Sequence, residues 1–190
     1  MIIGICGFAG SGKSEVASYL AKEHKFKRVN FKDALLSEVR EKFPDLLRNF
    51  ETGYRKSIDQ LFSEKPPEIR SLLQNYGTEV RRADDEYYWI NKWLSTIKET
   101  NRSGTDGNSK STNIVADDVR FFNELSAITE KDGILIRTIC DDDTEHGTHI
   151  SELEHVKFIE DFTIHATRGD VKSIHKQVED ILTTIKSNTD

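Results

Sequence analysis

A lysine and a serine close a glycine-rich segment near the start of the chain, a combination that can bind phosphate. Residues 7–14 read GFAGSGKS and match the pattern G-x-x-x-x-G-K-[ST] at every fixed position. In such a loop, backbone N–H groups point at phosphate oxygens, the lysine reaches the β- and γ-phosphates, and the hydroxyl binds Mg²⁺. The pattern predicts a site for ATP and Mg²⁺ that is formed by Gly7, Ala9, Gly10, Ser11, Gly12, Lys13 and Ser14. The alternative is a glycine-rich turn that contains a lysine by chance, but the apolar run before it and the helical pattern after it favour the phosphate site.

Two acids and an arginine follow a later apolar run. Residues 113–118 read NIVADD, and Arg120 comes two residues after Asp118. Because ligands of parallel sheets bind beyond the carboxyl ends of the strands, we expect Asp117, Asp118 and Arg120 near the phosphate-binding loop. An acid in this place often holds Mg²⁺ through water, and we expect Asp118 rather than Asp117 to join Ser14 at the metal. An ion pair between one of these acids and Arg120 is the alternative.

The middle of the chain offers three more groups that could bind an anionic acceptor. Arg81 and Arg82 end a predicted helix, and the planar guanidinium group of arginine pairs bidentately with phosphate. A cation pair that only stabilises the end of the helix is the alternative. Asp33 follows the second predicted strand, where it could orient the acceptor or cap the next helix.

These residues suffice for an in-line phosphoryl transfer. A phosphate monoester loses its second proton with a pKa of about 6, so at neutral pH it is mostly dianionic and needs no general base. Catalysis would then depend on positioning and on the charges of Lys13, Mg²⁺, Arg82 and Arg120. An acceptor that reacts through a hydroxyl group would instead need a nearby aspartate, and Asp33 is the candidate.

The hydrophobic pattern predicts the elements that hold these residues. Short apolar runs predict strands at 2–6, 27–31, 113–117, 133–139 and 162–165. Helical spacing predicts helices at 13–23, from Asp33 to near Pro44, and at 57–62, 67–82, 86–100, 123–131 and 169–186. Residues 101–112 are all polar or glycine and predict a loop. Strands that alternate with helices predict an α/β fold with a five-stranded parallel sheet and right-handed crossovers.

Composition limits the class of protein. The chain has 190 residues, of which 36% are hydrophobic and 32% charged, enough for one α/β domain. No apolar run could cross a bilayer, and the first residues lack the features of a signal peptide, so we expect a cytoplasmic protein with no membrane partner. The net charge of −6 argues against a protein that coats nucleic acid, although a few arginines can still bind a small anion. Cys6 and Cys140 lie in apolar segments without metal or redox spacing, which predicts buried thiols.

Four segments, in order along most of the chain, resemble the phage-type deoxynucleoside monophosphate kinases. They are GFAGSGKS at 7–14, LQNYGTEVRR at 73–82, DDVRFFNE at 117–124 and HISE at 149–152. The resemblance implies a single domain, a P-loop NTPase three-layer sandwich with a helical acceptor-binding insertion at about 33–100 and a lid-like segment at 140–152. It also implies ATP-dependent phosphorylation of a (deoxy)nucleoside 5′-monophosphate in the cytoplasm of a bacterium or of a phage-infected host.

The same resemblance suggests roles for individual residues. It suggests Arg81, Arg82 and Arg120 as contacts of the nucleotide or its phosphate, with Glu124 in a supporting role. His149 and Glu152 would order the lid or the nucleotide, with a surface histidine as the alternative. The chain departs from the family pattern at 140–148, CDDDTEHGT, which is acidic where a lid with arginines is expected, so catalysis by a lid arginine is in doubt.

Other functions remain open at this stage. A kinase of another small metabolite, such as one that resembles dephospho-coenzyme A kinase, would depend on Asp33. A nucleotide-binding regulator would bind the triphosphate with little turnover, but the arginines argue against it. The sequence leaves open the preferred base, the choice between deoxyribose and ribose, and whether the chain forms a homodimer.

Overall fold

The computed structural model describes residues 1–103, 112–140 and 153–187. The chain forms two compact units: residues 1–30 with 94–190, which hold the sheet, and residues 31–93, which are helical. The helical unit lies inside the region that the sequence predicts to bind the acceptor. That the two units act as a single kinase domain stays a prediction.

The first unit is built on a five-stranded parallel sheet, as the sequence predicts. Its strands follow the order β2-β3-β1-β4-β5, so that β1 lies at the centre. Their bounds are Ile2–Cys6 (β1), Lys27–Arg28 (β2), Ile114–Ala116 (β3), Ile134–Cys140 (β4) and Phe162–Ala166 (β5). All five residues of β1 are buried, which fits a strand covered on both faces.

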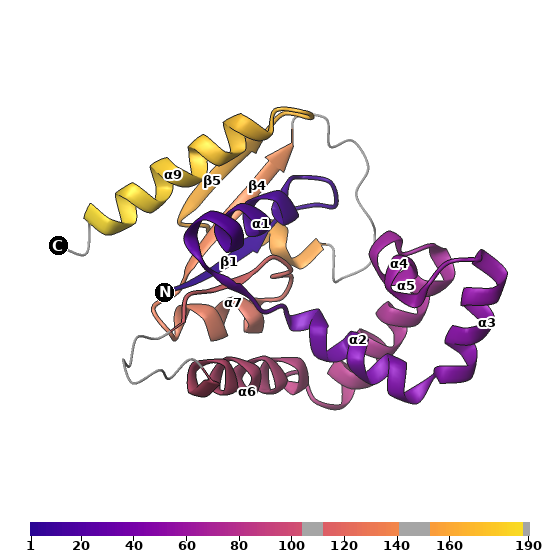
Figure 1. The fold of residues 1–190 in the computed structure, drawn as a ribbon. Coiled ribbons are helices and arrows are strands. Elements are labelled where there is room, and N and C mark those ends of the chain that lie inside the picture. The colour runs from indigo at the N-terminus through magenta and orange to yellow at the C-terminus, as the bar shows by residue number, and fades with distance from the viewer. Residues whose placement is uncertain (104–111, 141–152, 188–190) are drawn as a thin grey trace. The chain divides into compact units, whose positions relative to one another are not determined.

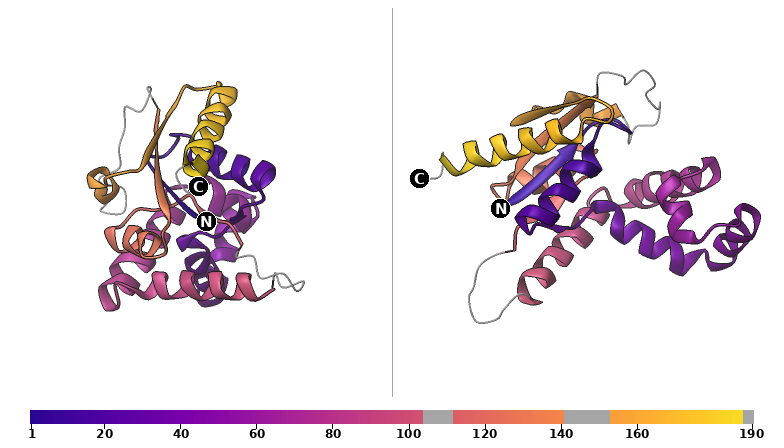
Figure 2. Two further views of the ribbon diagram at one scale, coloured as in Figure 1. Left: turned by 90° about the vertical axis from the view of Figure 1, so that its left-hand side faces the viewer. Right: turned by 45° about the horizontal axis from the view of Figure 1, so that its top comes forward.

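Helices cover both faces of this sheet and complete a three-layer α/β sandwich. Helices α1 (Lys13–His24) and α9 (Val171–Ser187) share one core with the sheet, which includes Leu20 and Val178 (Figures 1 and 2). On the other face lies α7 (Phe122–Thr129), whose Ile128 comes close to Gly4 of β1. A short 3₁₀ turn, η2 (Glu154–Lys157), precedes β5. No helix in the described ranges is long and apolar enough to span a bilayer.

The second unit is a small bundle of helices with its own apolar core. Its helices are α2 (Phe31–Lys42), α3 (Pro44–Tyr54), α4 (Ile58–Glu64), α5 (Pro67–Gln74) and the first part of α6 (Tyr88–Ser103), as Figure 1 shows. The core residues include Val39, Leu61, Ile69 and Trp89. Ser57 and Gln60 form a capping box that starts α4.

One turn of this bundle departs from the α-helix. Residues Asn75–Arg82, labelled η1, continue α5 as a π-helix, a form that is rare and often found at functional sites. A β-carbon on Gly77 would come within 3.0 Å of Leu35, so the glycine allows α2 and η1 to pack closely. The carbonyl oxygen of Gly77 accepts a hydrogen bond from the indole of Trp89 at 2.9 Å.

Four sequence predictions about element bounds are wrong. The second strand ends at Arg28, because Phe31 already begins α2, and Asp33 therefore lies in the first turn of that helix and does not cap it. Pro44 does not end helical structure but starts α3, in the first turn where its missing N–H costs nothing. The predicted loop at 101–112 begins later, because α6 continues to Ser103; residues 104–111 lie outside the described chain.

Candidate active site

The phosphate-binding loop connects β1 to α1 and is fixed to the neighbouring strand β4. Gly7 has a φ of 139°, and a β-carbon there would lie 2.4 Å from the carbonyl oxygen of Thr138, so only glycine fits. Ser11 is fully buried, and its hydroxyl oxygen lies 2.6 Å from the hydroxyl oxygen of Thr138. Sequence reasoning missed Thr138; a second polar residue, beside Arg137 in the mostly apolar strand β4, was the available signal.

Lys13 lies back over its own loop. Its ammonium group donates hydrogen bonds to the carbonyl oxygens of Gly7, at 2.8 Å, and Phe8. Ala9 and Gly10 are exposed at the tip of the loop. The ammonium group thus donates to neutral carbonyl oxygens in the loop. Phosphate oxygens are charged and therefore stronger acceptors, so they can take the place of these carbonyl oxygens.

Ser14 faces Asp117, at the start of α1 and the end of β3 respectively. The hydroxyl group of Ser14 donates a hydrogen bond of 3.0 Å to Oδ2 of Asp117, whose side chain is only 2% exposed. The backbone N–H of Asp117 donates to the side-chain oxygen of Asn30 at 2.9 Å, which fixes the end of β3. The structure therefore favours Asp117 as the acid beside Ser14, where the sequence favoured Asp118. Asp118 is also buried, at 7% exposure, and its role in metal binding stays a prediction.

The guanidinium group of Arg28, on β2, reaches the same carboxylate. It forms an ion pair with Oδ2 of Asp117, and its Nη2 lies 3.4 Å from the hydroxyl oxygen of Ser14. Three side chains from three elements thus meet at one carboxylate oxygen. Sequence reasoning did not select Arg28, because β2 is too short to show a pattern.

The oxygens of Ser14 and Asp117 fit a hard cation such as Mg²⁺, which prefers oxygen ligands and is usually held by one or two side chains and the substrate phosphates. Among the described residues there is no group of three or more His, Cys, Asp or Glu side chains that could hold a metal alone. A metal at this place would therefore take its remaining ligands from a bound nucleotide and from water.

Arg120 and Glu124 meet through the backbone. The carboxylate of Glu124 accepts hydrogen bonds from the backbone N–H groups of Arg120, at 2.7 Å, and Phe121, at 3.2 Å, and is 3% exposed. These contacts fix the turn that carries Arg120 and fit the supporting role. A direct contact of Glu124 with the substrate stays a prediction.

A buried histidine lies beside the loop. His155 is 2% exposed, and its ring centroid lies 4.9 Å from that of Phe8. Burial, together with the charges of Arg137, Lys13 and Arg120, lowers the pKa of His155 from its ordinary value of 6.5 to about 4. The imidazole is therefore neutral at pH 7, and its Nδ1 has no hydrogen-bond partner among the described residues.

Arg137, on β4, has local partners. It forms an ion pair with Glu160 at 2.9 Å and donates hydrogen bonds to the carbonyl oxygens of His155 and Phe158. It joins the segment before β5 to β4. Cys6 and Cys140 are buried free thiols, as predicted, and burial raises the pKa of Cys6 to about 11.

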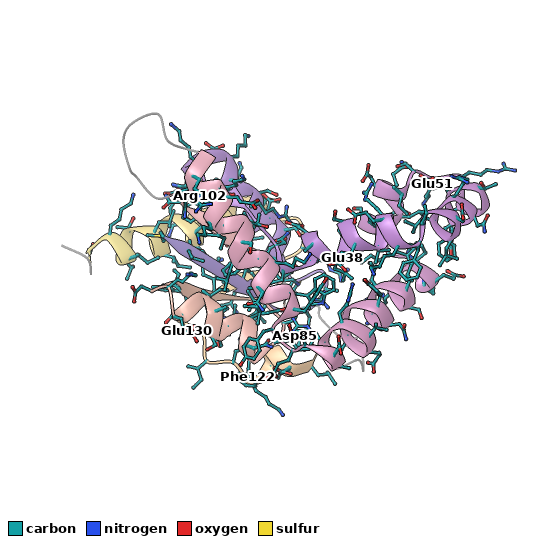
Figure 3. The ribbon with its side chains drawn as sticks, turned by 90° about the horizontal axis from the view of Figure 1, so that it is seen from below. Glu38, Glu51, Asp85, Arg102, Phe122 and Glu130 are labelled. Atoms are coloured by element: carbon teal, nitrogen blue, oxygen red, sulfur yellow. The ribbon has the colours of Figure 1, made fainter. Side chains whose placement is uncertain are left out.

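In the helical unit, Arg81 belongs to a network around Glu38. Figure 3 labels Glu38 on α2, and its side chain is 11% exposed. Its Oε2 lies 3.0 Å from Nη2 of Arg81 and accepts a hydrogen bond of 2.9 Å from the hydroxyl group of Tyr76. Its Oε1 accepts from the hydroxyl group of Tyr88 and lies 3.3 Å from Nζ of Lys92.

The π-helix places two members of this network on one side. Nε of Arg81 donates a hydrogen bond of 2.9 Å to the hydroxyl oxygen of Tyr76, five residues earlier, which suits the i→i+5 repeat of a π-helix. Burial alone would raise the pKa of Glu38, but the hydrogen bonds from Tyr88, Tyr76, Lys92 and Arg81 outweigh it and lower this pKa to about 2. Glu38 therefore remains a carboxylate at neutral pH.

The predicted site residues fall on both units. The first unit carries the loop at 7–14, Asp118, Arg120 and Glu124, and the second carries Asp33, Arg81 and Arg82. Asp33 is exposed on α2, and Arg82 is half-buried at the end of η1. The lid-like segment, with His149 and Glu152, lies outside the described residues except for Cys140.

The five-stranded parallel sheet, with helices on both faces, confirms the predicted sandwich. A comparison with known proteins found a related protein. No family model matches the chain. A protein of Acanthamoeba polyphaga mimivirus, provisionally named a deoxynucleotide monophosphate kinase, is 30% identical over 170 residues, which cover 81% of each chain. This match includes most of the chain and most of the relative.

Solved structures of P-loop kinases also match. A dephospho-CoA kinase from Campylobacter jejuni has a TM-score of 0.49 and 13% identity, over 100% of this chain and 98% of that one. A shikimate kinase from Aquifex aeolicus has a TM-score of 0.45 and 13% identity, with the same coverage. At such scores and identities the likeness says nothing about the substrate.

Proposed function

The chain belongs to the deoxynucleotide monophosphate kinases, and on this premise we propose that it transfers the γ-phosphoryl group of ATP to a deoxynucleoside 5′-monophosphate. A member of this family is a phosphotransferase. The acceptor, the use of ATP with Mg²⁺ and the roles of the residues are the parts that we propose.

The loop at 7–14 binds the phosphates of ATP in this proposal. Its backbone N–H groups and the start of α1 face the anion, and Lys13 exchanges the carbonyl oxygens of Gly7 and Phe8 for oxygens of the β- and γ-phosphates. Ser14 and Asp117 hold Mg²⁺, either directly or through water. The metal supplies positive charge that offsets the charge of the leaving phosphates.

Arginines bind the acceptor. We carry over Arg120, whose backbone Glu124 holds, and Arg81 and Arg82 as candidates for guanidinium contacts with a dianionic monophosphate. Such an acceptor is already nucleophilic at neutral pH, so no residue has to remove a proton. Asp33 orients the nucleoside and does not act as a base.

One observation carries the assignment of the ATP side: the hydroxyl group of Ser14 contacts the buried carboxylate of Asp117 at the carboxyl edge of the sheet. A chance glycine-rich turn would not bring the last residue of the motif to an acid on β3. The identity of the acceptor is supported by family membership.

An assay of ADP release tests the proposal. The purified chain is incubated with ATP and Mg²⁺ and, in separate reactions, with each of the four deoxynucleoside monophosphates, their ribose counterparts and dephospho-coenzyme A. We expect turnover with one or more deoxynucleoside monophosphates and none with dephospho-coenzyme A. Turnover only with dephospho-coenzyme A, or ATP binding without turnover on any acceptor, would contradict the proposal.

A further inference from the structure

Arg28 occupies the position next to Asp117 where a metal would bind. Its guanidinium group pairs with the same oxygen, Oδ2, that accepts the hydrogen bond of Ser14. The side chain of Asp117 is 2% exposed, so its negative charge needs a nearby positive charge. Arg28 provides that charge in this structure.

A guanidinium group and Mg²⁺ are poor neighbours at one carboxylate oxygen. Two positive charges a few ångströms apart repel each other appreciably, because a partly buried site screens them less than water does. The side chain of Arg28 is 35% exposed, so it has solvent to move into. Asp117 is fixed at the end of β3 through Asn30, so the carboxylate stays in place while its counter-charge changes.

We propose that Arg28 and Mg²⁺ are alternative counter-charges of Asp117. Arg28 neutralises the carboxylate before the metal binds, and Mg²⁺ displaces its guanidinium group from Oδ2 when the nucleotide complex forms. Arg28 is therefore a positioning residue, which keeps Asp117 and Ser14 together and lowers the affinity of the site for the metal alone. The inference rests on the proposed function, because it takes the loop at 7–14 as the site of the Mg²⁺–nucleotide complex.

The variant Arg28→Gln removes the competing charge, and Lys27→Gln is its matched control. Lys27 is the preceding residue of β2, carries the same charge, and donates a hydrogen bond to Thr100, not to Asp117. Both variants change the net charge equally, so long-range effects on metal binding cancel in the comparison.

Calorimetry measures the result. Mg²⁺ is titrated into each protein saturated with ADP. The heat of titrating Mg²⁺ into ADP without protein is subtracted. We expect Arg28→Gln to bind Mg²⁺ about tenfold more tightly than wild type, because a charge a few ångströms from a carboxylate shifts its equilibria by at least a factor of this order. Lys27→Gln should stay within about twofold of wild type, as a distant surface charge is largely screened.

Thermal unfolding gives a second readout. The Tm of Arg28→Gln should be lower than that of wild type in EDTA, and the difference should shrink with Mg²⁺ and ADP. Mg²⁺ affinity equal to or weaker than wild type, with a Tm difference that Mg²⁺ does not reduce, would overturn the inference. A wild-type chain that binds no ADP would instead overturn the proposed function and the inference with it.

If Arg28→Gln does not fold, the wild-type chain can still decide the question. The Nε–Hε signal of Arg28 in an NMR spectrum is identified by its absence in Arg28→Lys. We expect it to shift when Mg²⁺ is added to the ADP complex and to stay in place with ADP and EDTA. A signal that does not respond to Mg²⁺ would mean that Arg28 keeps its place beside Asp117.

Discussion

The two units each bury a carboxylate that contacts an arginine and a hydroxyl group, and the two carboxylates have different surroundings. Glu38 accepts from two phenols and lies beside two cations, all within residues 31–93. Asp117 meets Arg28 and Ser14, and both of these lie where a metal and a nucleotide are expected. The negative charge of Glu38 is therefore balanced by groups of its own unit. At Asp117, in the inference above, Mg²⁺ takes over this role from Arg28 when the nucleotide complex forms.

This difference teaches how to separate architecture from chemistry in such a fold. A carboxylate whose pKa is lowered to about 2 by four neighbours on its own unit stabilises that unit. A carboxylate that accepts a hydrogen bond from the last residue of a phosphate-binding loop belongs, in the proposed function, to the site of the metal and the nucleotide. If this holds, the first unit should respond to Mg²⁺ and ADP and the second should not.

The largest effect should come from Lys13→Ala. The substitution removes the positive charge that would stabilise the transferred phosphoryl group, and we expect kcat to fall by about 10²- to 10³-fold. The Tm should change little, since the hydrogen bonds of Lys13 to the carbonyl oxygens of Gly7 and Phe8 stay within its own loop. Lys22→Ala, on the same helix but 83% exposed, is the control. Near-normal turnover of Lys13→Ala would remove the loop from the catalytic site.

The second effect concerns stability in acid. His155 has a pKa of about 4 in the folded chain against an ordinary 6.5, so the unfolded chain binds more protons between these values. Its contribution to stability is fully present above pH 6.5 and is lost as the pH falls towards 4, by up to about 3 kcal/mol. His155→Gln should flatten this part of the curve of unfolding free energy against pH.

The contribution of Glu38 to the free energy of unfolding should be lost at a lower pH than that of His155, which distinguishes the two units. Its pKa is lowered from 4.5 to about 2, so the stability it gives is present above pH 4.5 and is lost as the pH falls towards 2. Denaturant-induced unfolding measured from pH 7 to pH 2 would show both steps. A curve for His155→Gln that matches wild type between pH 6.5 and 4 would show that His155 is not the group responsible.

Glu38→Gln comes next in size and is the direct counterpart of the Arg28 variant. It removes the negative charge between Arg81 and Lys92, and we expect a loss of about 2 kcal/mol of unfolding free energy at pH 7. Tyr76→Phe, which removes one hydrogen bond to the same carboxylate, should cost about 1 kcal/mol. Adding Mg²⁺ and ADP should leave the loss from Glu38→Gln unchanged. A loss that shrinks with ligand would break the contrast between the units.

The sequence predicted the part of the site that is local in the chain. A motif such as residues 7–14 carries its own geometry, because a strand, a tight loop and a helix start follow one another. The five strands and their parallel order followed from the alternation of apolar runs and helices. Local pattern therefore predicted the fold and the strand–loop–helix geometry of residues 7–14.

The sequence could not predict contacts between distant residues. Arg28 and Asp117 are 89 positions apart, and nothing in the two-residue strand β2 marks its partner. The choice of Asp118 over Asp117 depended on which side of the strand end faces the loop, a difference of one residue that reverses the face. Glu38 looked like an ordinary charged residue of an amphipathic helix, and only the fold shows the four groups around it.

The smallest effect tests whether Glu124 supports the reaction through Arg120. Glu124→Gln keeps the shape of the side chain but weakens the two hydrogen bonds to the backbone of Arg120 and Phe121, which should cost about 1 kcal/mol of stability. If Glu124 positions Arg120, this variant should raise the KM for the monophosphate and leave the KM for ATP unchanged, in the same direction as Arg120→Ala but by a smaller factor. Steady-state kinetics with each substrate varied in turn measures both values. Equal changes in both KM values would mean that the turn at Arg120 supports the sandwich as a whole, and the acceptor side would then depend on the arginines of the helical unit.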